Sequence, residues 1–385
     1  MRFSVDAHAI GRHLTGNEVY IRNLLNGFAG LDRTSEFIAY LCAHSAEVSR
    51  VVPSRFTQRY VSRNSFLRLG IDLSRQLRRD KPDLIHVQYT APFGCPVPVV
   101  VSVHDVSFLE HPEYFPRSRR MQLRITVKQT VERAAKILTP SEFSRQAIAR
   151  AYDIDQSKIV VVPIAVSSSF HPIAREVAAG KVAARFNIPS PFILTVGDLQ
   201  PRKNHLGLLH AFEETLRQHP HLPHRLVFVG KETWYSKELH RAVMRSNVAG
   251  RVHFTGFVED PDLLQFYGAC DLFVFPAFYE GFGLPILEAM ACGRAVACSS
   301  ATAMPEVANA AGILFDPYSV PEMARAIGDV LLDEEMRVRL ERLGSNRAAS
   351  FTWERAAQRT LDVYYEVAGV GKPVPAMKLR ASSST

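Results

Sequence analysis

Two carboxylates flank a glycine-rich turn in the segment FVFPAFYEGFGLPILEAMACGRAVACSS, residues 273–300. Glu280 precedes the turn, and Glu288 follows eight positions later. Between them lie Gly281, Phe282, Gly283 and Leu284. The glycines allow a tight turn, and Pro285 suits the first turn of a helix whose free amides bind anions. This pattern predicts a site for a ligand with hydroxyls and phosphates. Acidic residues favoured by the helix dipole alone are the alternative.

Further candidate residues follow other apolar runs that read as strands. Arg202 and Lys203 come after FILTVGDL, and this pair can grip a phosphate or can simply lie on the surface. His104 ends VPVVVSVHD and could donate to a substrate oxygen or be a hydrogen-bonded core histidine. Gly16 and Asn17 lie at a loop-to-helix junction near the start of the chain, which could contact a phosphate or an acceptor.

Short β-branched runs alternate with helical patterns throughout, which predicts parallel sheets and right-handed βαβ crossovers. The series restarts near residue 191, after the Ser- and Pro-rich stretch PIAVSSSFHPIA. We therefore expect an α/β protein with two doubly wound domains facing across a cleft. The expected units are residues 1–168, residues 169–350, a helix over 351–370 that returns to the first domain, and a disordered tail over 371–385. In such domains ligands bind where loops leave the carboxyl ends of strands.

The charge of the chain is unevenly distributed. Residues 1–170 carry the whole net charge of +8, which predicts an anionic partner for the first half. Part of this charge lies at Arg117, Arg120, Arg124 and Lys128, spaced to share one helix stripe, although a solvated helix face is the alternative. Nucleic acid is not expected, because no recognition motif accompanies the charge. No apolar run is long enough to span a bilayer, and five scattered cysteines predict a cytosolic protein without disulfides or zinc.

Taken together, these motifs resemble the retaining glycosyltransferases of family 4, which have the two-Rossmann-domain GT-B fold. The resemblance covers nearly the whole chain and is most specific in EGFGLPILEAMACGRAVA, with VGDLQPRKN, VHFTGFV, VSVHD and TPSEFSR in the expected order. SVHDVSFLEHPEYFP and LQPRKN resemble the bacterial subgroup that adds mannose or related sugars to surface polysaccharides.

The resemblance implies a role for each matching residue. Glu280 and the amides of Phe282 to Leu284 hold the donor sugar and its phosphates, and Glu288 accepts from the ribose. Lys203 and Arg202 neutralise the diphosphate, and His104 contacts the sugar from the first domain. Further expected donor contacts are Gly197, Gly230, Lys231, Val258, Gly281 and Gly283. Gly16 and Asn17 are expected on the acceptor side.

The chain departs from the family pattern in three places. Asp198 stands where many members have the first phosphate-binding arginine, so we assign that work to Arg202. Ala165 replaces a usual linker glycine, and Asn17 with Glu18 replaces part of an N-terminal glycine pattern.

The resemblance implies a retaining enzyme that needs no metal or other cofactor and uses a nucleotide-sugar as its donor substrate. GDP-mannose is the expected donor, with UDP-glucose, another UDP-hexose or dTDP-rhamnose as alternatives. The expected acceptor is a lipid-linked or polysaccharide glycan, which would place the enzyme in the cytoplasm, in peripheral contact with the anionic inner face of the cytoplasmic membrane. A sucrose- or trehalose-type synthase, a nucleotide-sugar epimerase and a nucleotide-sugar-binding protein without catalysis are the alternative functions.

Overall fold

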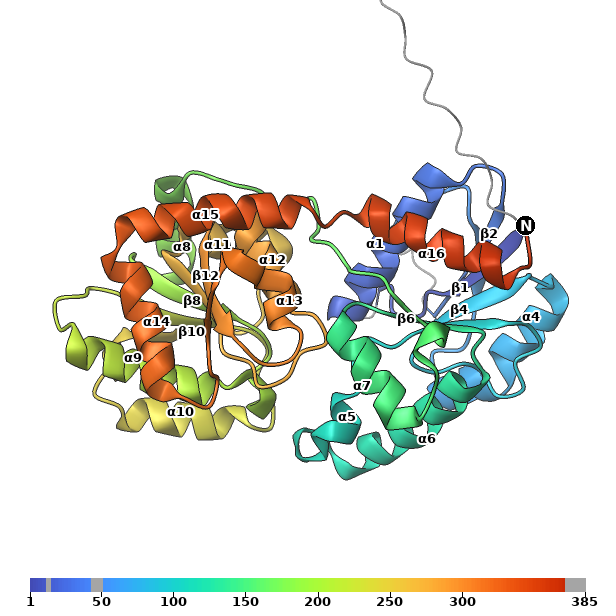
Figure 1. Cartoon of the computed structure of the whole chain (residues 1–385), viewed down its shortest axis with the longest axis horizontal. Helices are drawn as coiled ribbons and strands as arrows, with labels where there is room; N and C mark the ends of the chain where they lie inside the picture. The colour runs from blue at the N-terminus through green and yellow to red at the C-terminus, as the bar shows by residue number, and fades with distance from the viewer. Residues whose placement is uncertain (12–14, 43–50, 371–385) are drawn as a thin grey trace, which may run out of the picture.

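Short runs of apolar residues form two separate parallel sheets in the computed structural model (Figure 1). The structure describes residues 1–11, 15–42 and 51–370, so the predicted tail over 371–385 lies outside the described residues. Strands such as Leu84–Gln88 (β4) and Ala295–Ser299 (β12) are buried along their whole length, which requires layers on both faces of each sheet. The predicted α/β class with two doubly wound domains is confirmed.

The first sheet has the order β3-β2-β1-β4-β5-β6-β7, and every pairing is parallel. Its other strands are β1 (Arg2–Asp6), β2 (Glu36–Leu41), β3 (Thr57–Tyr60), β5 (Val99–Ser102), β6 (Lys136–Thr139) and β7 (Ile159–Val161). The strand order reverses between β1 and β4, where a doubly wound sheet opens a crevice at its carboxyl edge.

Helices cover the two faces of the first sheet in two groups. The elements around it are α1 (Thr15–Leu31), α3 (Ser65–Leu67), the π-helical turn η1 (Arg68–Asp72), α4 (Leu73–Asp80), α5 (Ser107–Glu110), the 3₁₀ turn η2 (Pro112–Tyr114), α6 (Arg117–Arg133) and α7 (Glu142–Tyr152). Buried side chains of α4, α6 and α7 share one core with the odd positions of β5, whereas α1 packs on the opposite face. Loops leaving the strands therefore emerge between two helical layers.

The second sheet repeats this arrangement with the order β10-β9-β8-β11-β12-β13. Its strands besides β12 are β8 (Phe192–Val196), β9 (Arg225–Val229), β10 (Val252–Phe254), β11 (Leu272–Phe275) and β13 (Ile313–Phe315). Its helices are α8 (Arg175–Phe186), η4 (Pro201–Lys203), α9 (His205–Gln218), α10 (Ser236–Arg245), α11 (Asp260–Ala269), α12 (Leu284–Ala291), α13 (Met304–Ala308), α14 (Val320–Leu332) and α15 (Glu334–Ala349). The order reverses between β8 and β11, which predicts its ligand crevice there.

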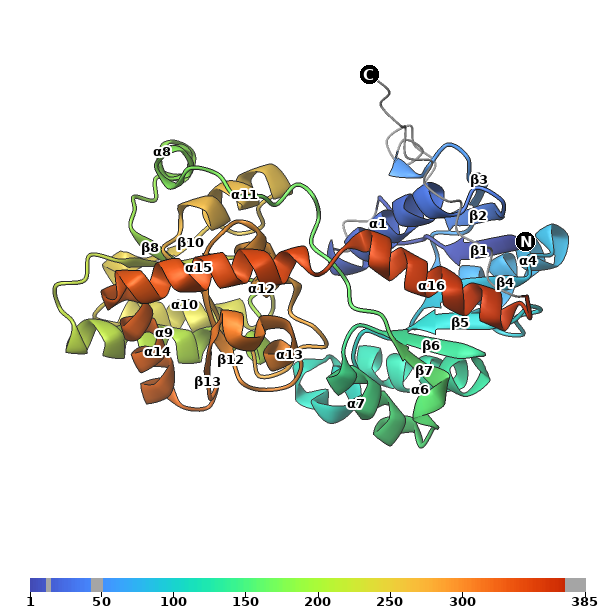
Figure 2. The ribbon, with the colours of Figure 1, turned by 45° about the horizontal axis from the view of Figure 1, so that its top comes forward.

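The last helix, α16 (Trp353–Val367), leaves the second domain and lies along α1 of the first (Figure 2). A Cβ at Gly27 would lie 2.4 Å from the Cβ of Ala357, so the two helices approach most closely where one lacks a side chain. The Tyr364 hydroxyl lies 2.6 Å from Nδ1 of buried His86, and the Tyr365 hydroxyl donates to Asp32 at 2.6 Å. These buried hydrogen bonds fix the helix to the first domain.

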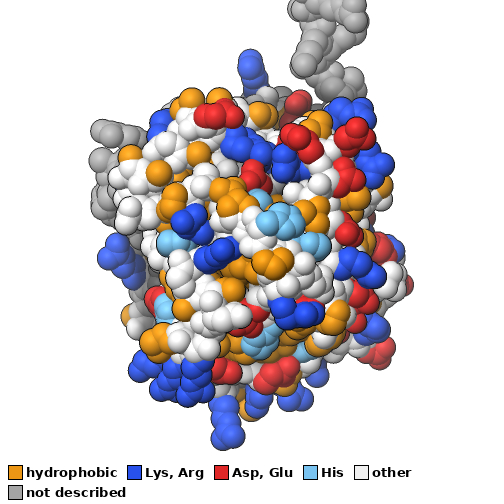
Figure 3. Space-filling model, turned by 90° about the vertical axis from the view of Figure 1, so that its left-hand side faces the viewer, with side chains coloured by type: hydrophobic (Ala, Val, Ile, Leu, Met, Phe, Trp, Pro, Cys, Tyr) orange, Lys and Arg blue, Asp and Glu red, His pale blue; other side chains and the backbone are white. Residues whose placement is uncertain are grey.

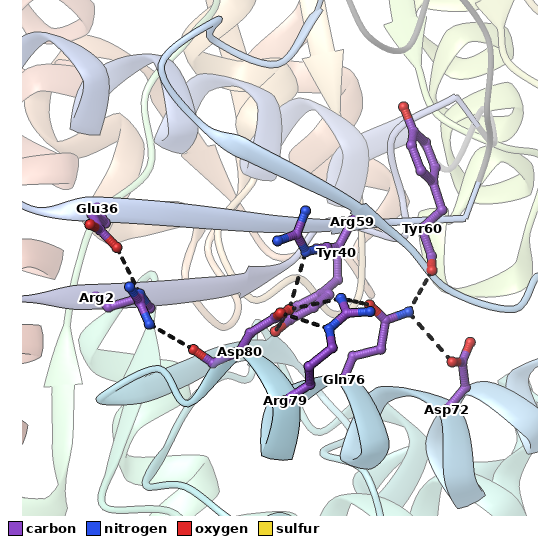
Figure 4. Close-up of polar contacts among 9 residues, drawn as sticks. All are labelled: Arg2, Glu36, Tyr40, Arg59, Tyr60, Asp72, Gln76, Arg79 and Asp80. Carbon is purple, nitrogen blue, oxygen red and sulfur yellow. Dashed lines mark hydrogen bonds and ion pairs between the residues drawn. The ribbon is translucent and has the colours of Figure 1, made fainter.

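A polar cluster on the face of the first sheet that α4 covers fixes the end of that helix (Figure 4). Asp80 accepts from the Tyr40 hydroxyl at 3.1 Å and pairs with Arg79 at 3.0 Å and Arg59 at 3.4 Å. Arg2 donates to the Asp80 carbonyl at 3.0 Å. Because the partners come from β1, β2 and β3, the cluster holds α4, and with it η1 and α3, against the sheet.

Candidate active site

The predicted basic pair and the first predicted carboxylate meet at the strand-order reversal of the second sheet. Arg202 and Lys203 follow β8 in η4, and Glu280 follows β11. Because β8 and β11 are neighbours in the sheet, their carboxyl ends bring these loops together. Glu280 accepts from Lys203 Nζ at 2.7 Å and also pairs with Arg202 Nη1. One carboxylate therefore bridges two cations.

The electrostatics of this cluster favour the charged form of Glu280 and work against that of Lys203. Burial opposes the ionisation of Glu280, but the charges of Arg202 and Lys203 outweigh it and hold its pKa below the usual value. Burial lowers the pKa of Lys203, and the nearby Arg202 adds to that effect, while Glu280 counteracts both. The two basic side chains thus lie side by side with one bridging acid between them, and an anionic ligand that bound both would take the place of that acid.

Glycines shape the space around Lys203. A Cβ at Gly197 would lie 3.1 Å from Cε of Lys203, and the ammonium lies 4.7 Å from the centre of the Phe275 ring. A Cβ at Gly230 would lie 2.0 Å from the carbonyl oxygen of Gly197. The loops after β8 and β9 touch here, and Gly197 has a φ of +152°. Side chains larger than hydrogen at these two positions would displace the lysine or separate the loops.

The remaining donor-side residues surround the same edge of the sheet. The Lys231 amide donates to Asp198 at 3.3 Å, so the aspartate that replaces the family's arginine ties together the loops after β8 and β9. The Lys231 ammonium lies over the ring of Phe257, 4.7 Å from its centre. Val258, in the loop after β10, is buried in the core of the second domain. Val258 therefore supports this edge through its packing.

The predicted helix begins at Leu284, and Gly283 caps it with a φ of +99°, which favours glycine. The first amides of a helix have no acceptor within it, so this end can receive an anion. Glu288 lies one turn along the helix and accepts from the Tyr267 hydroxyl at 2.8 Å. Burial raises the pKa of Glu288 to about 7, against the opposing effect of that hydrogen bond. The two acids flanking the turn therefore differ in charge near neutral pH.

This raised pKa predicts how folding stability depends on pH. Between the unfolded pKa near 4.5 and the folded value near 7, only the native state keeps the Glu288 proton, so the free energy of unfolding falls as pH rises. Glu288→Gln removes the titration. From pH 5 to pH 8 the unmodified chain should lose about 2 to 3 kcal/mol relative to this variant in urea unfolding. Parallel profiles for the two proteins would contradict the assigned pKa.

Residues of the first domain close over this cluster. A Cβ at Gly281 would lie 2.1 Å from the carbonyl oxygen of His104, so the two backbones are in direct contact. The Ser141 hydroxyl, at the N-terminus of α7, donates to the Gly281 carbonyl at 2.7 Å. Glu306, on α13, accepts the amides of Glu142 and Phe143 at 2.8 and 2.6 Å. These contacts bring the carboxyl edges of the two sheets together around Glu280.

A short chain of hydrogen bonds connects His104 with the predicted acceptor side. Nε2 of His104 lies 3.4 Å from Oε1 of Gln88, and Nε2 of Gln88 donates to the carbonyl of Asn17 at 3.4 Å. Burial lowers the pKa of His104 to about 4, so its imidazole is neutral at physiological pH. Gly16 is exposed at the start of α1, with open space where a Cβ would lie. The structure thus brings Asn17, Gln88 and His104 to one edge.

Besides Gln88, four residues that contribute to this site were not predicted as site residues. Tyr89 has a φ of +59° at the end of β4, and its ring lies edge-on to His104 with centroids 5.7 Å apart. Tyr267 holds Glu288, and Ser141 with Glu306 joins the domains. The motif TPSEFSR marked the Ser141 region as similar to the family but gave it no contact.

In residues 1–11, 15–42 and 51–370 there is no group of three or more His, Cys, Asp or Glu side chains placed to hold a metal ion. Over the same ranges, every helix is too short or too polar to cross a bilayer.

Two family profiles match the chain: Glycosyltransferase Family 4 over residues 14–170, and Glycosyl transferases group 1 over residues 181–347. The O-antigen chain mannosyltransferase B of Escherichia coli is 35% identical over 270 residues, which cover 69% of each protein. Sucrose-phosphate synthase from Thermosynechococcus elongatus superposes with a TM-score of 0.76 at 19% identity, over 96% of this chain and 99% of that one. Anabaena Alr3699/HepE, solved with UDP and glucose, superposes with a TM-score of 0.74 at 21% identity, over 94% of this chain and 98% of that one. The fold is therefore that of the GT-B enzymes.

Proposed function

The chain belongs to glycosyltransferase family 4, among bacterial mannosyltransferase-like members, and we propose that it transfers mannose from GDP-mannose to a growing, lipid-linked surface glycan. In this proposal the transfer retains the anomeric configuration of the sugar and needs no metal ion. The observation that carries the proposal is the bridging of Arg202 and Lys203 by Glu280 at the strand-order reversal. The mannose and glycan assignments draw on the O-antigen mannosyltransferase that the chain resembles. The enzyme is proposed to work in the cytoplasm, at the inner face of the cytoplasmic membrane.

Glu280 is proposed to hold the place of the donor diphosphate until the donor binds. With the acid between them, the two cations stay close together despite their mutual repulsion. The arriving diphosphate then takes over Arg202 and Lys203, together with the amides that begin α12. Glu280 is released to accept hydrogen bonds from hydroxyls of the donor sugar, which lies beside it. The exchange keeps the buried charges paired at each stage.

The proposed chemistry is same-face substitution at the anomeric carbon. The bond from that carbon to the diphosphate oxygen breaks, the bond to the acceptor oxygen forms, and the acceptor proton passes to the departing phosphate oxygen. Negative charge grows on the diphosphate as the bond breaks, and Lys203 with Arg202 stabilises it there. The neutral imidazole of His104 can donate to or accept from a sugar hydroxyl. The contacts of Gly281 with the first domain exclude water that would hydrolyse the donor.

The test is a transfer assay with purified chain, GDP-mannose and a lipid-linked glycan. We expect release of GDP only when the glycan is present, an α-linked mannose in the product by NMR, and unchanged turnover after chelation of divalent ions. Parallel reactions with UDP-glucose, other UDP-hexoses and dTDP-rhamnose check the donor. A product of inverted configuration would overturn the mechanism, and turnover of another donor alone would overturn the assignment of mannose.

A further inference from the structure

A buried ion pair with an adjoining histidine lies at the carboxyl end of β1. Asp6, the last residue of that strand, is 1% exposed and pairs with Nη1 of Arg68, which is 4% exposed. Nδ1 of His8 lies 3.1 Å from Oδ1 of Asp6, and the His8 amide donates to the same oxygen at 3.3 Å. One carboxylate therefore holds an arginine and an imidazole. None of these three residues has a role in the proposed donor site.

This cluster lies where the strand order of the first sheet reverses. β1 and β4 are neighbours there, and their register places the end of β1 beside Gln88 at the end of β4. Ligands of doubly wound sheets bind at the carboxyl edge of such a reversal. Gln88 in turn contacts His104 and the Asn17 carbonyl. The cluster therefore occupies in the first domain the position that Glu280 and the basic pair occupy in the second.

Two backbone features mark the same edge of the sheet. Arg68 begins η1, a π-helical turn inserted between α3 and α4, and such turns are frequent at functional sites. The Phe93 amide, in the loop after β4, donates to the Leu69 carbonyl of η1 at 2.8 Å, so the turn borders that loop. Tyr89, in the same loop, has a φ of +59°, which costs an aromatic residue free energy. Strained residues of this kind cluster at functional sites.

Arg68 also carries an unpaired donor. Within residues 1–11, 15–42 and 51–370, its buried Nε has no hydrogen-bond partner, although leaving a buried donor unpaired costs free energy. An oxygen from a bound ligand would complete the hydrogen bonds of this side chain. The unpaired donor is therefore a sign of a binding site that is independent of the backbone features.

The carboxylate of Asp6 determines what the imidazole can bind. Burial opposes the ionisation of Asp6, but the interactions with His8 and Arg68 outweigh it and hold the pKa of Asp6 well below its usual value. An ionised carboxylate keeps the imidazole proton on the facing Nδ1, which leaves the lone pair on Nε2 to accept a hydrogen bond. The side chain of His8 is 17% exposed, so a ligand can reach it more easily than the other two. The cluster thus presents one oriented hydrogen-bond acceptor.

This combination selects the class of ligand. The charges of Asp6 and Arg68 cancel, so the cluster favours neither a phosphate nor a cation. A hydroxyl suits it, because a hydroxyl can donate to Nε2 of His8 and accept from a buried donor. A sugar carries several hydroxyls, and this edge of the sheet also holds His104. We propose that His8, oriented by Asp6 and Arg68, binds a hydroxyl of the acceptor sugar, and in naming the acceptor this inference rests on the proposed function.

Steady-state kinetics of the full chain with GDP-mannose and the lipid-linked glycan test the role of each residue. His8→Ala is expected to raise the acceptor KM about tenfold, the scale of one hydrogen bond, with the donor KM and kcat nearly unchanged. His8→Gln should recover most of this loss, because its amide oxygen can accept the same hydrogen bond. Asp6 and Arg68 are positioning residues. Asp6→Asn should therefore match His8→Ala, since its amide donates to Nδ1 and moves the imidazole proton to Nε2.

Sugar binding measured without transfer tests the inference separately. Saturation-transfer NMR uses the methyl α-glycosides of mannose, glucose, galactose and N-acetylglucosamine as probes. We expect at least one to bind the unmodified chain, and to bind His8→Ala about tenfold more weakly. The matched control is His210→Ala, which removes an exposed histidine from α9 and should bind as the unmodified chain does. It lies in the second domain, whose far end carries histidines scattered among acidic and basic side chains (Figure 3).

Several outcomes would overturn this role of His8. They are no binding of any glycoside, equal binding by His8→Ala, and equal losses for donor and acceptor. A lowered kcat with an unchanged acceptor KM would also overturn it, because His8 would then act in proton transfer and not in binding. If Asp6→Asn fails to fold, recovery by His8→Gln still decides the question. A failed transfer assay, beside glycoside binding that His8→Ala weakens, would reject the proposed function alone.

Discussion

Replacing Lys203 with methionine is expected to lower kcat by about 10²- to 10³-fold. A loss of this size is typical when an enzyme lacks one preorganised group that donates to the negative charge developing in the transition state. Methionine keeps the unbranched chain that packs against Gly197 and Phe275, so the change removes the ammonium with little change in volume. Arg202 still pairs with Glu280 in this variant, which leaves the acid partnered. Single-turnover kinetics with saturating donor and acceptor measure the loss.

A matched control separates charge at this position from charge in general. Lys237→Met removes an exposed ammonium from α10 of the same domain, and its kcat should stay within twofold. Thermal unfolding of both variants checks that each is folded. A Lys203→Met enzyme with near-normal kcat would show that the leaving diphosphate is stabilised elsewhere, and the assignment of the basic pair would then be wrong.

Sequence reasoning could bring Glu280, Arg202 and Lys203 together because parallel topology restricts where strand ends lie. Each residue follows an apolar run that reads as a strand, and a doubly wound sheet places such loops at one edge. The same reasoning predicted that α12 begins near Pro285, because glycine and proline mark that turn in the sequence. These predictions need only local patterns and one rule of topology.

Other features depend on contacts that a single sequence does not encode locally. Strand β3, with the residues TQRY, has no apolar run that would mark it in the sequence, because it lies at the sheet edge, where polar, half-buried or exposed positions take the place of such a run. The partner of Glu288 is Tyr267, which lies on another helix, α11. The contacts of Glu306 with α7 join positions more than 160 residues apart. Periodicity carries no information on such pairs.

The meeting of the two domains at Gly281 explains a glycine whose backbone conformation does not require one. Its φ lies outside the left-handed region, unlike that of Gly283. What excludes a side chain is the His104 carbonyl, because backbone atoms of the opposite domain cannot move aside by changing rotamer. Gly281 is therefore required for closure of the site and not for the turn in which it lies.

Gly281→Ala is accordingly expected to lower kcat by about 10²-fold while donor binding to the second domain changes little. The added methyl would lie 2.1 Å from the His104 carbonyl oxygen, so the domains must separate by roughly 1 Å. A misplacement of about 1 Å in an aligned active site lowers the rate by about 10²-fold. Gly250→Ala is the matched control, since a Cβ there meets open space, and its kcat should be unchanged. Calorimetry with GDP-mannose and kinetics with the glycan acceptor measure the two effects. Equal losses of donor affinity and kcat would place the defect within the second domain, and normal turnover would show that transfer proceeds without this contact.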